Sequence, residues 1–208
     1  NWLDINPSFN PIEGISDKTE MARLGVWRHD FRNRAFAQHI NSLPPEDQTL
    51  VLVSKVEHLC HLYPYLSGFD LAFGAGKSSM EEATYWANYG KIPPEAVQYR
   101  KNKNEQLRLD FGKGKKRKML VTSIWDTGAN FPELADIYRV DPFDSGYIKD
   151  TQAPGRGSRL YEGKEYASLN DSVDRFDSRL YDIARRKRSN YKSQGWDEVG
   201  WQTKDQTT

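Results

Sequence analysis

The supply of aliphatic side chains changes abruptly along this chain of 208 residues. Up to about Trp125 there are apolar stretches that can build a small core, such as the Leu-Val-Leu-Val run at residues 50–53. From Asp126 to Thr208, aromatic residues are about as common as leucine, isoleucine and valine together. So few aliphatic side chains offset the entropic cost of ordering only weakly, whereas aromatic rings are favoured in contact surfaces. The second half is therefore predicted to lie against another surface.

Charge and cysteine content narrow the class of protein. The net charge of +1 gives no overall positive field of the kind that drives non-specific binding to nucleic acid. The single cysteine, Cys60, excludes an internal disulfide and favours a reducing, intracellular compartment. No apolar run approaches the ~20 residues of a membrane span, so no transmembrane segment is predicted. Because the chain begins at Asn1 rather than Met, a removed targeting segment is one interpretation, and it favours the mitochondrion.

The periodicity of apolar residues predicts a mainly α fold. Helical spacing from Ser16 to just before Pro44, and from there to Pro64, predicts two helices that form an antiparallel hairpin. A capping box at Ser79 and Glu82 predicts a short helix over residues 80–89. We expect an extended N-terminal arm over 1–15, a helical unit over 16–111, a small β-hairpin over 105–126, and a long extended C-terminal arm over 127–208 with a docking helix over about 170–190.

The β-hairpin and the docking helix depend on shorter patterns. Residues 107, 109 and 111 are apolar and alternate with polar residues, and a Gly-Lys-rich turn separates them from the apolar run at 119–125. Further on, one narrow apolar stripe is spaced at i, i+3, i+7 and i+10, and two tryptophans follow it in a polar tail. The predicted partner-binding residues are Val173, Phe176, Leu180, Ile183, Trp196 and Trp201.

These features predict a non-catalytic accessory or structural subunit that binds and staples neighbouring subunits of a large assembly. An organellar respiratory or ATP-synthase complex is one such host. The expected partners are other protein subunits, which would cover the stripe unless the free face of the helical unit covers it. In this interpretation the chain is not an enzyme, and no catalytic residue, cofactor or metal ligand is assigned.

A nucleic-acid-binding protein is the alternative. Two basic runs, at residues 113–118 and 185–188, are suited to local contacts with RNA or lipid phosphates. The candidate phosphate contacts are Lys115, Lys116, Arg117, Arg185, Arg186 and Arg188. Reversing the charges of the first run would abolish binding in this alternative.

A second alternative comes from the sequence Asp126-Thr127-Gly128-Ala129, which follows the apolar run that ends at Trp125. This segment resembles the active-site loop of the retroviral-type aspartic proteases. The resemblance implies that Asp126 is a catalytic carboxylate and that a dimer supplies the second one. It covers only this loop and the hairpin before it, and the further strands of that family have no counterpart downstream.

Two other motifs are incomplete. Residues 73–78, Phe-Gly-Ala-Gly-Lys-Ser, end like a phosphate-binding P-loop, but the first glycine of that pattern would fall at Leu71, and helices are expected before it. A group of Glu57, His58, Cys60 and His61 has metal-ligating side chains at helical spacing, which His29 and His39 of the neighbouring helix could extend. Cys60 lies on the apolar stripe of its helix, which favours packing over ligation.

Overall fold

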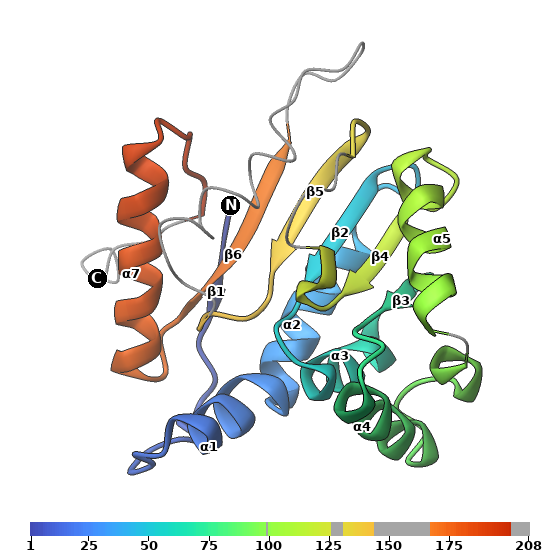
Figure 1. Cartoon of the computed structure of the whole chain (residues 1–208). Helices are drawn as coiled ribbons and strands as arrows, with labels where there is room; N and C mark the ends of the chain where they lie inside the picture. Colours follow the sequence, from blue (N-terminus) through green and yellow to red (C-terminus); the bar gives the residue numbers. More distant parts are fainter. Residues whose placement is uncertain (99, 126–130, 144–166, 201–208) are drawn as a thin grey trace.

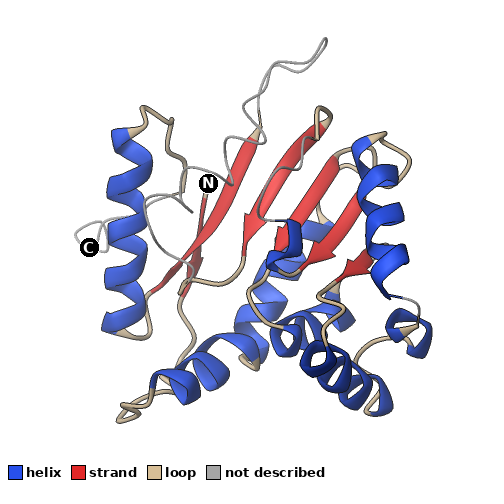
Figure 2. Cartoon of the chain, in the orientation of Figure 1, coloured by secondary structure: helices blue, strands red, loops and turns tan. Residues whose placement is uncertain are grey.

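The computed structural model describes residues 1–98, 100–125, 131–143 and 167–200. Within these ranges six strands form one parallel sheet in the order β1-β6-β5-β2-β4-β3 (Figure 2). The strands are β1 (Trp2–Ile5), β2 (Gln48–Leu52), β3 (Asp70–Ala72), β4 (Lys118–Val121), β5 (Leu134–Arg139) and β6 (Ser168–Asp174). The strand arrows point toward the end of the sheet where α1, α3 and α4 lie, which we call the carboxyl edge (Figures 1 and 2).

Helices connect the strands. The α-helices are α1 (Lys18–Ala22), α2 (Asp30–Asn41), α3 (Val56–Leu62), α4 (Lys77–Asn88), α5 (Arg100–Gly112) and α7 (Ser178–Ser193). A π-helical turn, η1 (Arg23–Trp27), follows α1, and the short 3-10 turns are η2 (Tyr63–Tyr65), η3 (Pro94–Val97) and η4 (Ser123–Trp125). None of the helices in the described ranges is long and apolar enough to cross a membrane.

Successive side chains of the central strand β2 enter different cores, because neighbouring residues of a strand point to opposite faces. Val51 packs in a cluster with Phe36 of α2 and with side chains of α3 and α4. Leu50 packs in a second cluster with Leu107 and Phe111 of α5. The sheet is therefore buried on both faces, as all-parallel sheets are.

Helix α7 covers the β1–β6 side of the sheet on the same face as α5 (Figure 1). Val173 of β6 is buried with Ala184 and Tyr191 of α7, and Trp2 of β1 joins them. The first turn of α7 is buried by the N-terminal region of the chain. Its Leu180 packs in a cluster with residues of α1 and η1. The chain thus supplies its own cover for this helix.

The prediction of a mainly α fold is wrong, because the structure is an α/β fold with a doubly covered parallel sheet. The second helix of the expected hairpin is β2 followed by the short α3. The run at residues 50–53 is apolar on both sides because β2 is buried on both faces, and such a run also matches a buried helix. The expected hairpin of helices is therefore absent from the described residues.

The expected β-hairpin and C-terminal arm are also wrong. Leu107 and Phe111 lie one helical turn apart on the buried side of α5, while Leu109 is exposed, so their alternation is a helical pattern. The arm contains β5, and the first five residues of its expected helix, 170–174, form the end of β6. β1 joins the sheet from within the expected N-terminal arm. The expected helix over 80–89 corresponds to α4, which begins earlier, at Lys77, and ends at Asn88.

Candidate nucleic-acid interface

The carboxyl edge has a topological switch point between β2 and β5. The chain leaves β2 toward β3 on one side of the sheet and leaves β5 toward β6 on the other, although β2 and β5 are neighbours. In open α/β sheets ligands bind outside the carboxyl ends of the strands at such a point, because the diverging connections leave a crevice there. The residues that follow these two strands are therefore candidate site residues.

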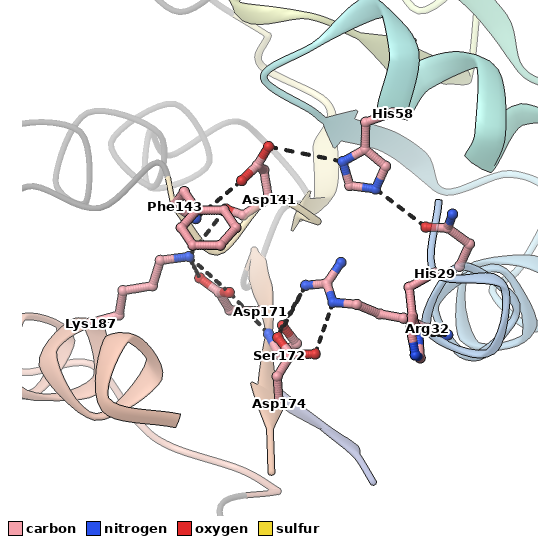
Figure 3. A network of polar contacts seen from close by, with 10 residues as sticks. His29, Arg32, His58, Asp141, Phe143, Asp171, Ser172, Asp174 and Lys187 are labelled. Carbon is pink, nitrogen blue, oxygen red and sulfur yellow. Dashed lines mark hydrogen bonds and ion pairs between the residues drawn. The ribbon is translucent and has the colours of Figure 1, made fainter. Parts of the chain in front are cut away.

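Asp141, which follows β5, connects the elements around the switch point (Figure 3). Its carboxylate accepts hydrogen bonds from the Ser54 hydroxyl, from the Trp27 indole Nε1–H at 3.2 Å and from the Phe143 backbone N–H at 3.1 Å. His58 Nδ1 of α3 lies 3.9 Å from the same carboxylate. One buried side chain thus joins η1, the β2–α3 connection, α3 and the segment after β5.

The electrostatics of this group favour an ionised Asp141. Burial acts to raise the pKa of Asp141, but contacts with His58, the Ser54 hydroxyl and the Phe143 N–H outweigh burial and place the pKa below its ordinary value. The group contains no paired carboxylate or activated nucleophile among the described residues. We interpret Asp141 as a positioning residue that fixes the carboxyl edge.

Two buried ion pairs join β6 to helices on the two faces of the sheet (Figure 3). Arg32 of α2 donates from Nε to Asp174 at 2.8 Å and from Nη2 to the Ser172 hydroxyl at 2.8 Å. On the opposite face, Lys187 of α7 binds Asp171 at 2.9 Å. Helices on both faces are therefore tied to one strand, which holds this half of the carboxyl edge rigid.

The exposed part of the carboxyl edge lies beside this ordered centre. Residues 75–78 are exposed and run from the end of β3 into the first turn of α4, whose N-cap, Gly76, makes no side-chain capping bond. Lys55, exposed after β2, lies near enough to α4 to affect the pKa of Glu82 on that helix. We call Lys55 and residues 75–78 the α4 lip. Uncapped backbone N–H groups and two lysines suit a phosphate group.

The α4 lip contains the incomplete P-loop of the sequence. A strand, β3, does precede it, so the expectation that only helices come before residues 73–78 is corrected. Leu71 still occupies the place of the first glycine. An uncapped helix N-terminus is present here without the full nucleotide-binding motif.

The first basic run lies at the opposite, amino edge of the sheet, before β4. Lys116 pairs with Asp70 at 2.8 Å, and Arg117 pairs with Glu133 at 2.6 Å. Lys115 is exposed. Contact of this run with phosphates stays a prediction.

The second basic run lies on α7 and is dispersed. Arg185 is exposed and lies 3.5 Å from Asp182, Arg188 pairs with Glu198, and Lys187 is buried. Arg185 and Arg186 line an open hollow of about 720 Å³ between α1 and α7. Helix α7 therefore turns these cations in different directions.

The predicted partner-binding stripe is covered within the chain. Val173, Leu180 and Ile183 are buried, and Phe176 is half-buried with its ring stacked on His29 at a centroid distance of 5.2 Å. Trp196 is half-buried against Tyr191 at 5.2 Å. Trp201 lies outside the described residues.

The potential metal ligands do not converge. His58 bonds Asn33 and faces Asp141, Glu57 pairs with Arg23 and Arg28, and Cys60 packs in the core. No group of three or more His, Cys, Asp and Glu side chains is placed to hold a metal ion in the part of the chain that the structure describes.

The hairpin that was expected before the protease-like loop is not found among the described residues. Asp126 lies outside the described residues, and the residues expected as the first strand of its hairpin belong to α5. Sequence reasoning also missed Ser54 and Asp141, which lie two residues beyond the ends of β2 and β5, and Asp174, which ends β6. Recognising β2, β5 and β6 as parallel strands would have been the signal that groups them.

No family model and no curated protein matches the sequence. Solved structures do match the fold. T4 UvsW matches with a TM-score of 0.59 at 14% identity, covering 92% of this chain and 38% of that chain. The C-terminal domain of the DEAD-box protein Dbp5 matches with a TM-score of 0.57 at 11% identity, covering 81% of this chain and 82% of that chain. The L327V variant of S. cerevisiae Dbp5 bound to RNA and ADP BeF3 matches with a TM-score of 0.51 at 12% identity, covering 78% of this chain and 35% of that chain.

These structures share with this chain its α/β fold with a parallel sheet. The expectations of a non-catalytic accessory subunit of a respiratory or ATP-synthase complex, and of a chain that is not an enzyme, are overturned, because the structures of similar fold are a domain of a DEAD-box protein and T4 UvsW.

Proposed function

We propose that this chain is a RecA-like domain of a helicase-type enzyme and that it binds a strand of RNA or DNA at its carboxyl edge. The observation that carries the proposal is the α4 lip, where an uncapped helix N-terminus and the exposed Lys55 and Lys77 adjoin an ordered switch point. Phosphates bind at helix N-termini because backbone N–H groups and the helix dipole both favour an anion. The net charge of +1 is consistent with such local binding.

The fold likeness supports the same assignment. A Dbp5 structure of similar fold contains RNA together with ADP BeF3. In this chain the incomplete P-loop argues that nucleotide hydrolysis needs a second, nucleotide-binding domain. We therefore assign strand binding to this domain and hydrolysis to the enzyme that contains it.

A binding experiment with charge-reversed variants tests this assignment. Lys55→Glu/Lys77→Glu is expected to bind a labelled oligouridylate roughly tenfold more weakly, because two phosphate contacts are lost. The plot of log K against log salt should lose about 1.4 of its slope, at ~0.7 per contact with a single strand. Fluorescence anisotropy over a salt series measures both quantities.

Lys115→Glu is the matched control, since it reverses an exposed charge at the amino edge. Its affinity should equal that of the unaltered chain. If reversal at Lys115, Lys116 and Arg117 abolishes binding while the lip variant binds normally, the strand lies at the basic run and not at the α4 lip. If no variant binds more weakly than the unaltered chain, strand binding at the carboxyl edge is rejected.

A further inference from the structure

The C-terminal end of α4 presents aromatic rings that the core does not use. Tyr85 is 52% exposed and Tyr89 is 66% exposed, while Trp86 between them is half-buried. Adjacent exposed rings of this size are typical of surfaces that bind a partner, because they combine a large contact area with few rotatable bonds. We call Tyr85, Trp86 and Tyr89 the α4 ring cluster.

The rings of the cluster hold one another in place. Tyr85 and Tyr89 lie with centroids 4.7 Å apart, and Tyr85 meets Trp86 edge-on at 5.0 Å. The rings of His61 and Trp86 meet edge-on, with their centroids 4.5 Å apart. Burial, together with the charges of Lys91 and Arg28, lowers the pKa of His61 to about 4, so its ring is neutral at pH 7. The cluster is thus ordered before any ligand binds, which lowers the entropic cost of binding.

Cations surround the cluster. The Arg28 guanidinium lies 5.5 Å from the Trp86 ring centroid, and Arg28 also pairs with the buried Glu57. Lys91 is placed beside the cluster by the end of the helix. Gly90 has a φ of +70°, which allows the chain to turn so that the Lys91 N–H donates to the Trp86 carbonyl at 3.0 Å. Aromatic faces with flanking cations match the two chemical parts of a nucleic acid strand, its bases and its phosphates.

We propose that Tyr85 and Tyr89 stack unpaired bases of the strand whose phosphates contact the α4 lip. Lys77 of the lip and Tyr85 of the cluster both lie on α4, and the eight residues from one to the other span roughly 12 Å at ~1.5 Å per residue. A strand that follows α4 therefore meets phosphate-binding groups first and the stacking rings next. This inference rests on the proposed strand binding and adds that the domain contacts bases as well as the backbone.

The test compares Tyr85→Ala/Tyr89→Ala with the unaltered chain on two probes, an oligoadenylate and the same oligomer with abasic positions. The variant is expected to bind oligoadenylate roughly tenfold more weakly, in the range that stacked aromatics show. Its salt slope should stay unchanged, because no phosphate contact is lost. The abasic oligomer should bind the unaltered chain and the variant equally, because its abasic positions offer no base that could stack on the tyrosine rings.

Two controls separate stacking from other effects. Tyr85→Phe/Tyr89→Phe keeps the rings and should bind normally, and Phe9→Ala removes an aromatic that is 65% exposed outside the cluster and should also bind normally. An alanine variant with unchanged affinity for oligoadenylate would overturn the inference and leave the cluster to a protein partner. If binding depends on Lys55 and Lys77 but not on the tyrosines, base stacking is rejected and strand binding at the α4 lip is retained. If the chain binds neither oligomer, the proposed function fails with it.

Discussion

Arg32 is completely buried, and its charge is balanced mainly by Asp174. Arg32→Met leaves that carboxylate buried without its cation. We expect a loss of about 3–5 kcal/mol in the free energy of unfolding, the usual cost of breaking a buried pair from one side. Urea denaturation followed by circular dichroism measures it. The double variant Arg32→Met/Asp174→Leu should recover more than half of the loss, since no unpaired charge remains. A double variant as unstable as the single one would show that the guanidinium has another essential role.

Asp136 predicts a pH dependence. Burial raises the pKa of Asp136 to about 6, although Asn170 donates to its carboxylate at 3.4 Å. The unfolded chain, with a pKa near the ordinary 3.8, therefore releases its proton first as the pH rises. Between about pH 4 and pH 6 the folded state binds more protons, so the free energy of unfolding falls in that window because of this group.

Asp136→Asn keeps an acceptor for Asn170 and removes the titration. The stability of this variant relative to the unaltered chain should rise from pH 4 to pH 6 and then level off. Urea titrations at several pH values give the difference, in which the other ionisable groups cancel. A difference that is constant over this window would contradict a raised pKa.

At the scale of elements, the sequence indicates helices better than strands. The helix expected over residues 80–89 could be predicted because the spacing of Ser79 and Glu82 indicated a helix here and Gly90 follows its end, although α4 begins at Lys77 and Ser79 lies within its first turn. β2 could not be separated from a helix, because a strand buried on both faces has no alternation. The Pro-Pro-Glu sequence before it favoured the helix further.

β6 carries even less signal. Its residues Asn170, Asp171, Ser172 and Asp174 are all buried, which reverses the usual relation between polarity and exposure. They are satisfied by side chains from distant helices, such as Arg32 and Lys187, so the strand is stable only in the tertiary structure. Because β6 depends on these long-range partners, neither the strand nor the switch point beside it could be predicted from the sequence. The Gly-Ala-Gly-Lys-Ser segment could be recognised in the sequence, but its location at the carboxyl edge of the sheet could not.

At the scale of the whole molecule, the first and the last strand among the described residues pair in one sheet. β1 pairs in parallel with β6, and the Asn1 backbone nitrogen donates to the Leu169 carbonyl at 2.6 Å. Trp2 is 7% exposed, and its ring packs against that of Tyr191 with the centroids 5.6 Å apart. The aromatic residues that suggested an external partner therefore cover one another, because residues from the start and the end of the chain form one core.

This closure predicts that a change at the N-terminus weakens the centre of the sheet. Trp2→Ala should cost about 3–5 kcal/mol, the usual loss for a large buried ring. Because β1, β6 and β2 belong to one sheet, faster hydrogen exchange should appear both in α7 and in β2, which mass spectrometry of peptides from the two elements can follow. Phe9→Ala removes an exposed ring nearby and should change the stability by less than about 0.5 kcal/mol. Faster exchange in α7 alone, with β2 as protected as before, would mean that the two chain ends dock on an independently folded centre.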